Sequence, residues 1–227
     1  PVGQQMGYKY DGFFSEEDVA KYETERGKSI PDHGTGYIPK PGDVKYKDIS
    51  GPDGVPDGVI DDYDKTNIGS PMPKFTFGWT NTFRYKNFDL SVFINGSYGN
   101  KVYNYLSMKL THMNSPWTNQ LNAVNGRAQL VPINPNKVYE DGTMWYNDVS
   151  NVMVANPGAS IPRATINDPN DNDRISDRYI EDGSYIRLKN ISLGYTFPKK
   201  TIDKLGLSNL RIYANIQNLL TITGYDG

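Results

Sequence analysis

The sequence predicts an all-β fold: a partial antiparallel β-barrel of the transmembrane kind, with long extracellular loops. Four segments alternate apolar and polar side chains, which is the period of a strand that faces two different environments. Long segments rich in Asn, Asp, Pro and Gly separate these strands. The chain also carries 17 Tyr, 8 Phe and 3 Trp, a content that suits an interfacial aromatic girdle or a sugar-binding surface.

Residues 74–98 are predicted to form a β-hairpin of the barrel wall. In 74–85, aromatic side chains occupy one face and mostly threonines the other, with Asn81 interrupting the apolar face. A tight turn at Lys86 and Asn87 leads to a second strand, in which Phe93 is the exception on the polar face. At ~3.3 Å per residue and a tilt near 40°, eleven residues cover roughly 28 Å, close to the ~25 Å apolar band of such barrels.

Two further strands are predicted within 184–219, joined by a charged periplasmic linker at 198–209. Residues 184–197 run from charged through aliphatic to aromatic side chains, an order that suits a strand crossing an outer membrane. Residues 210–219 also alternate, with Leu210, Ile212, Ala214 and Ile216 on one face. Residues 220–227 are expected to start the last extracellular loop.

Residues 1–73 and 99–183 are predicted to be extracellular loop regions, apart from a short helix near 103–110. A structureless segment as long as 99–183 argues against a compact soluble domain. Long external and short periplasmic connections are typical of outer-membrane barrels. Because four strands cannot close a barrel, we expect upstream strands of the same protein to complete the sheet.

An acidic motif within the first loop region has the spacing of a calcium loop. Calcium takes six to eight oxygen ligands around a sharp turn. The candidate ligands are the side chains of Asp53, Asp57, Asp61 and Asp64 and the backbone carbonyl of Val59. The motif is incomplete, because Val55 stands where an acid is expected. The alternative is an acidic turn that uses Asp and Gly for their backbone tolerance.

Four aromatic side chains in 99–183 are candidate contacts for a substrate or a partner: Tyr103, Trp117, Trp145 and Tyr146. Exposed aromatics stack on sugars or anchor proteins, and they also form the small cores of long loops. A second acidic run, 168–173, could bind an ion or sugar hydroxyls, although a solvated loop rich in Asp and Asn is favoured. His33 and His112 stand alone in the sequence, so no metal triad, catalytic dyad or enzyme activity is predicted.

The composition excludes some functions. A net charge of −2 argues against a nucleic-acid partner, because phosphate binding needs a concentrated basic surface. With 37% hydrophobic residues, the chain has no apolar run of the roughly 18 residues that a membrane helix requires. The absence of cysteine is compatible with a location outside the cytoplasm. No signal peptide is recognised, because Pro1 begins within a pattern.

Four stretches carry a resemblance to a known family. They are PVGQQMGYKYDGFFSEED (1–18), PGDVKYKDISGPDGVPDGVIDDYDKTNIGSPMPKFTFGW (41–79), SDRYIEDGSYIRLKNISLGYTFP (176–198) and LRIYANIQNLLTITGYDG (210–227). In this order they resemble the C-terminal portion of SusC/RagA-type TonB-dependent outer-membrane transporters. The family's signal peptide, TonB-contacting segment and plug would precede these residues, and a final strand would follow Gly227.

The resemblance implies a barrel of about 22 strands in the outer membrane of a Gram-negative, Bacteroidetes-like bacterium. Such a transporter imports oligosaccharides or peptides with a SusD-like surface lipoprotein, and TonB drives it through the N-terminal part. Lipid and lipopolysaccharide would surround the barrel. The alternative from another class is a secreted β-rich carbohydrate-binding or adhesion module with a calcium loop. It fits less well, because polar strand faces would have to pack in a sandwich core.

Overall fold

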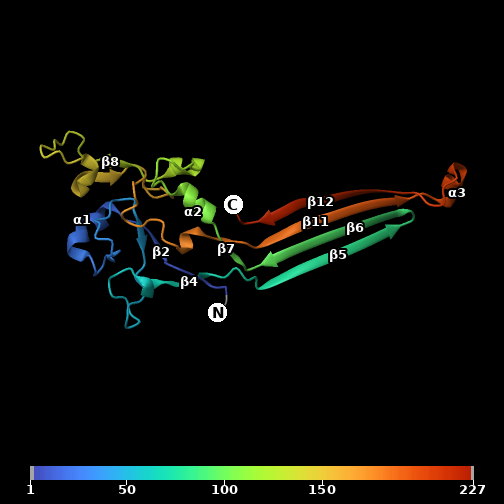
Figure 1. The fold of residues 1–227 in the computed structure, drawn as a ribbon, viewed down its shortest axis with the longest axis horizontal. Coiled ribbons are helices and arrows are strands. Elements are labelled where there is room, and N and C mark those ends of the chain that lie inside the picture. The colour runs from blue at the N-terminus through green and yellow to red at the C-terminus, as the bar shows by residue number, and fades with distance from the viewer. Residues whose placement is uncertain (1–2, 226–227) are drawn as a thin grey trace. The chain divides into compact units, whose positions relative to one another are not determined.

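The computed structural model describes residues 3–225 and contains two compact units (Figure 1). Residues 70–102 and the segment from 181 onward form the first, here called the sheet unit. Residues 4–69 and 103–180 form the second, here called the loop unit. Of the predicted regions, residues 1–2 and 226–227 lie outside the described part of the chain.

The sheet unit is a four-stranded antiparallel sheet in the order β12-β11-β6-β5. Its strands are β5 (Phe75–Tyr85), β6 (Phe88–Tyr98), β11 (Tyr185–Thr196) and β12 (Arg211–Thr223). All four lie where the sequence predicts strands. The fourth continues to Thr223, however, so the prediction that it ends at residue 219 and yields to a loop is wrong. The hairpin turn is accommodated by a left-handed backbone at Lys86, with φ 50°.

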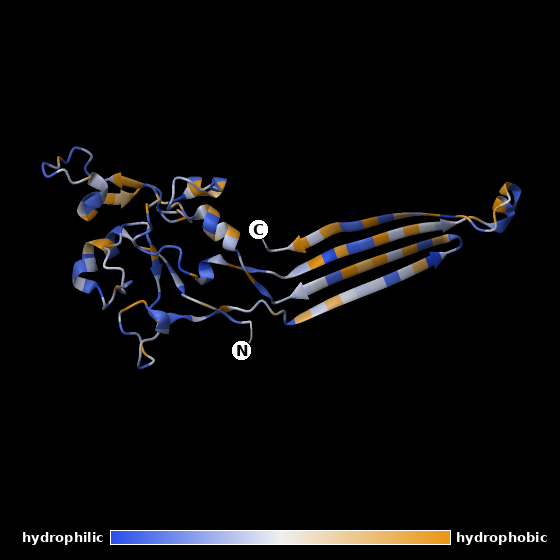
Figure 2. Cartoon of the chain, viewed as in Figure 1, coloured by the Kyte–Doolittle hydropathy of each residue, from blue (hydrophilic) through white to orange (hydrophobic). Residues whose placement is uncertain are grey.

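One face of this sheet is apolar across all four strands. The register aligns Trp79 with Ile94, and Ile94 with Leu188. Residues in register share a face, so the predicted apolar sets of the four strands form one continuous surface. Figure 2 shows the resulting bands of hydrophobic and hydrophilic residues along the strands. The opposite face is mainly polar and includes an ion pair between Arg211 and Asp89, at 2.6 Å.

A β-bulge in β11 keeps the apolar face continuous. The register of β11 shifts between Leu188 and Asn190 against both neighbouring strands. Without the extra residue, Leu188 and Ile191 would point to opposite faces, because they are an odd number of positions apart. With it, they align with Ile94 and Val92, which share a face of β6. The sequence pattern did not reveal this bulge.

The loop unit is built from short elements. Its strands are β1 (Gln5–Gly7), β2 (Tyr10–Phe13), β3 (Val44–Tyr46), β4 (Thr66–Gly69), β8 (Leu130–Pro132) and β9 (Val152–Val154), which pair as β1-β4, β2-β3 and β8-β9. The strands β7 (Lys101–Tyr103) and β10 (Ile180–Asp182), most of whose residues belong to the sheet unit, pair with each other. The two predicted loop regions are therefore not structureless: they fold together, joined by contacts between residues far apart in sequence.

Two small apolar clusters form the core of the loop unit. One contains Tyr8, Val44, Tyr46 and Ile60, and the other contains Phe14, Val19, Tyr22 and Ile30. Helix α1 (Glu16–Glu25) contributes Val19 and Tyr22, which are three positions apart and so share a face. A capping box between Ser15 and Asp18 fixes its start.

The remaining helical segments are short. Helix α2 spans Tyr105–Thr111, against a predicted 103–110, and α3 (Lys199–Ile202) lies within the predicted charged linker. The 3-10 turns are η1 (Asp62–Asp64), η2 (Asn122–Gly126), η3 (Trp145–Asn147), η4 (Val149–Asn151), η5 (Asp177–Tyr179) and η6 (Asp203–Leu205). Between residues 3 and 225, no helix has the length and apolar character needed to cross a membrane.

Gly58, in the calcium-like motif, is required by close backbone packing. Its φ is +87°, and a Cβ there would lie 2.2 Å from the carbonyl oxygen of Gly27. We expect Gly58→Ala to lower the free energy of unfolding of the loop unit by roughly 1–3 kcal/mol, from strain and displaced backbone. The matched control is Gly54→Ala: Gly54 has φ +78° but open space around the Cβ position. Equal losses in urea unfolding of the two variants would contradict the packing role.

Candidate functional site

The candidate calcium residues lie in one turn region, but their oxygens serve the backbone. Asp64 is fully buried, and its carboxylate accepts hydrogen bonds from the backbone N–H of Ile49 (2.7 Å), Ser50 (3.1 Å) and Asp61 (2.9 Å). The carboxylate of Asp61 in turn accepts from the N–H of Tyr63 at 2.8 Å. These bonds hold the start of η1 in the manner of a capping box.

The other candidate ligands are exposed. Asp57 accepts a hydrogen bond from the backbone N–H of Val59 at 3.1 Å, and Asp53 lies at the surface. Among the described residues, the carboxylates of this motif form no group of three close enough to share an ion. The arrangement matches the alternative of a turn built with Asp and Gly. Calcium binding here stays a prediction.

Asp64 separates the two interpretations of this motif. We expect Asp64→Asn to destabilise the loop unit by about 1–3 kcal/mol, because the new NH₂ group would face the Asp61 N–H instead of accepting from it. The loss should be the same in EDTA and in calcium, as measured by urea unfolding. A loss that appears only in calcium would favour an ion held by this carboxylate.

The four aromatic candidates differ in exposure: Trp117 and Tyr146 are exposed, whereas Tyr103 and Trp145 are half-buried. Tyr103 is half-buried, its ring meets that of Tyr179 edge-on at 6.5 Å, and its hydroxyl lies 2.7 Å from the sulfur of Met108. Trp117 is 91% exposed. The rings of Trp145 and Tyr146 meet edge-on at 5.7 Å, and Tyr146 lines a cleft of the loop unit. Tyr103 thus packs within the loop unit, whereas the exposed Trp117 and Tyr146 are available to ligands.

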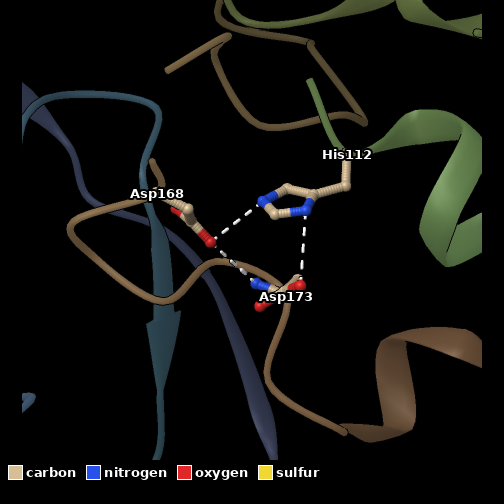
Figure 3. Close-up of side chains that lie close together, drawn as sticks. All are labelled: His112, Asp168 and Asp173. Atoms are coloured by element: carbon tan, nitrogen blue, oxygen red, sulfur yellow. Dashed lines mark hydrogen bonds and ion pairs between the residues drawn. The ribbon is translucent and has the colours of Figure 1, made fainter. Parts of the chain in front are cut away.

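His112 is not isolated in the structure, contrary to the prediction. Figure 3 shows its imidazole between two carboxylates of the 168–173 run. Nε2 lies 2.9 Å from Oδ2 of Asp168, and Nδ1 lies 3.3 Å from Oδ2 of Asp173. Lys109, on the same helix, approaches Asp173 at 3.7 Å. His112 directly follows the last residue of α2 and caps the C-terminal end of this helix.

This geometry uses both ring nitrogens of His112 in contacts with carboxylate oxygens. A metal ion bound by the ring would have to replace one of these contacts, because it needs a nitrogen lone pair. Within the described part of the chain, His112, Asp168 and Asp173 are the only group of three residues whose potential metal-ligand atoms lie close together. Both carboxylates of this group contact the imidazole. The contacts of His112 and Lys109 with Asp168 and Asp173 link α2 to the 168–173 loop.

The 168–173 run is a polar core, not the solvated loop that the sequence predicts. Asp168, Asn170 and Asn172 are all buried. Asn172 accepts from the backbone N–H of Val44 at 2.6 Å and donates to Asp168 at 2.7 Å, while Asn170 donates to the carbonyl of Val44 at 2.9 Å. The amides therefore take the place of a further strand beside β3, where they satisfy its backbone.

An ion pair extends this polar core. Nε of Arg163 lies 2.7 Å from Oδ1 of Asp43, and Arg163 also donates to the hydroxyl of Tyr37 at 3.0 Å. Burial raises the pKa of Asp43, with the Arg163 guanidinium acting in the opposite direction. Burial also raises the pKa of Tyr37 to about 12, so this hydroxyl stays protonated. Asp43 and Arg163 lie far apart in the sequence, and no local spacing signals their contact.

Comparison with known proteins identifies relatives over the full chain. The chain is 32% identical to TonB-dependent receptor P3 of Formosa agariphila over 229 residues, which is 100% of this chain and 18% of that receptor. It is 29% identical to TonB-dependent receptor SusC of Bacteroides thetaiotaomicron over 173 residues, covering 75% of this chain and 14% of SusC. The chain thus spans less than a fifth of the length of these relatives. No family model matches it.

Solved structures agree on the fold. The RagAB peptide transporter matches with a TM-score of 0.62 at 17% identity, over 99% of this chain and 19% of the transporter chain. Its 'open-open' state matches with a TM-score of 0.57. At this identity the likeness shows the fold alone. It confirms the predicted class, an all-β chain that forms part of a larger barrel.

Proposed function

Because this chain belongs to the SusC/RagA-type TonB-dependent receptors, as a C-terminal portion of one, we propose that it supplies wall strands and outer loops of an outer-membrane transporter. The whole protein would import oligosaccharides or peptides. The sheet unit would form part of the barrel wall, and the loop unit would lie on the extracellular side. The role of this segment is then architectural, with a part in cargo contact, and involves no covalent chemistry.

The continuous apolar face of the sheet unit carries this proposal. Phe83, Ile212 and Ile222 on this face are more than half exposed. In water such a surface would drive aggregation, whereas lipid covers it without cost. The strands also have the length that an outer-membrane barrel needs, and their polar face suits a lumen.

The relatives suggest the partners of the whole protein. A SusD-like surface lipoprotein would close over the extracellular side, and TonB would supply energy through a part of the protein outside this chain. Lipid and lipopolysaccharide would contact the apolar face and the outer rim. We place the protein in the outer membrane of a Gram-negative, Bacteroidetes-like bacterium. The names of the relatives, receptors and a peptide transporter, support a protein that is not an enzyme.

Two adjacent residues on opposite faces of β6 test the membrane orientation. We expect Val92→Arg to destabilise the folded barrel by about 2–3 kcal/mol, because it places a charge on the lipid face. Ser91→Arg, one position away on the polar face, should be tolerated. Folding is measured as the heat-modifiable mobility of the intact protein after extraction from outer membranes. Equal tolerance of both variants would contradict the assignment of the apolar face to lipid.

The composition of the native particle tests the proposal as a whole. Mild detergent extraction is expected to yield a large assembly that contains upstream barrel sequence and a surface lipoprotein. Deletion of TonB should then abolish the accumulation of the cargo that the transporter imports. Recovery of the chain as a small particle in the absence of detergent would contradict the proposal and favour the secreted binding module.

A further inference from the structure

The loop unit contains a cleft of about 940 Å³ whose charge is unbalanced. Lys40, Arg127 and Arg163 line it, and no carboxylate appears among its described lining residues. Its lining comes from segments that are distant in the sequence, including residues 113–116 and 163–166. Charged clefts with apolar walls concentrate ligands of the opposite sign.

Two of these cations, Lys40 and Arg127, form no ion pair within the described residues. Arg163 pairs with Asp43, which is not among the lining residues of the cleft. Lys40 donates to the side-chain oxygen of Asn147 at 2.8 Å, and Arg127 donates to the carbonyl of Val124 at 3.3 Å, both neutral acceptors. Burial, followed by the nearby charge of Arg163, lowers the pKa of Lys40, and the charge of Asp43 acts in the opposite direction.

The wall of the cleft suits peptide side chains better than sugar rings. Met113, Leu130 and Ile166 supply aliphatic surface. The ring of Tyr146 has the ammonium of Lys40 5.3 Å from its centroid, so that face is closed to a stacked sugar. Carboxylates, which commonly accept hydrogen bonds from sugar hydroxyls, are missing from the described lining. Aliphatic walls with unpaired cations fit a chain that carries both apolar and acidic side chains.

We propose that this cleft is a cargo site that binds acidic peptides, with Arg127 and Lys40 pairing with carboxylates of the peptide. This inference rests on the proposed import function and narrows its cargo. The guanidinium of Arg127 can form a bidentate pair with a carboxylate, and Lys40, which is more buried, adds a point charge. The apolar wall then contacts the neighbouring side chains of the peptide.

Binding to the intact, detergent-extracted protein tests the site. The probe is a short fluorophore-labelled peptide that alternates glutamate and leucine, and its match carries glutamine in place of glutamate. We expect the glutamate peptide to bind roughly tenfold more tightly, as for one charge-assisted pair. Arg127→Gln should reduce this preference, because only Lys40 then remains to pair with a carboxylate, and should leave the affinity for the glutamine peptide unchanged. Lys28→Gln, which removes a surface cation outside the cleft lining, should change neither affinity.

Several results would overturn the inference. Equal affinity for the two peptides, or a preference that Arg127→Gln leaves undiminished, removes the cleft as the acidic site. Tighter, Arg127-dependent binding of an oligogalacturonate overturns the peptide assignment in favour of an acidic glycan. Uptake measurements distinguish a failure of the acidic-peptide site from a failure of the proposed import function. TonB-dependent uptake of the glutamate peptide that is indifferent to Arg127→Gln would leave import intact and reject the site. Absence of the protein from outer membranes would reject import itself.

Discussion

Replacing Arg163 by methionine is expected to lower the free energy of unfolding of the loop unit by about 3–5 kcal/mol, because it leaves a buried carboxylate without its cation. Asp43 is 0% exposed and Arg163 is 9% exposed. Methionine retains most of the side-chain volume, so the loss reports on charge more than on packing. Urea-series pulse proteolysis of the intact, detergent-extracted protein measures this loss in the loop unit.

Two further variants locate the cause of this loss. Adding Asp43→Leu to Arg163→Met should recover much of the stability, because removing both charges of a buried pair is often nearly neutral. Arg26→Met removes an exposed arginine that pairs with Asp32 at 2.6 Å, and it should cost far less. If Arg163→Met costs no more than Arg26→Met, Asp43 is not an uncompensated charge in the variant.

The strands could be predicted because their signal is local. In β5 and β6 each side chain alternates with its neighbour, and the two-residue turn at Lys86 and Asn87 fixes their register. The bulge near Lys189 escaped prediction because it alters only the parity between two halves of β11, each of which alternates correctly. The resemblance to a family depended on motifs along the chain, so it was also open to sequence reasoning.

The interior of the loop unit could not be predicted, because it is made of contacts between distant segments. The run at 168–173 has the composition of a surface loop, yet Asn172 bonds to the backbone of Val44. The spacing of His112 and Asp168 in the sequence does not predict that their side chains are in contact. Polar cores of this kind satisfy backbone groups in place of a regular sheet, and their partners follow from the tertiary fold alone.

Acid is expected to weaken the loop unit through His33, by about 3 kcal/mol between neutral pH and pH 4. The imidazole is 3% exposed, between the rings of Phe14 and Tyr46 at 5.3 and 5.4 Å. Burial, followed by the charge of Arg174, lowers its pKa from 6.5 to about 4. The folded state therefore favours neutral histidine. Its stability is complete above pH 6.5 and is lost as the pH falls toward 4.

His33→Phe isolates this effect, because phenylalanine fills the same aromatic site and does not titrate. We expect the variant to be about 3 kcal/mol less sensitive to the change from pH 7 to pH 4, in the same pulse-proteolysis assay. The neighbouring Asp32 does not confuse the result: its pKa is lowered from 3.8, so its contribution is lost only below that window. If wild type and His33→Phe lose stability in parallel between pH 6.5 and pH 4, His33 is not the acid-sensitive group.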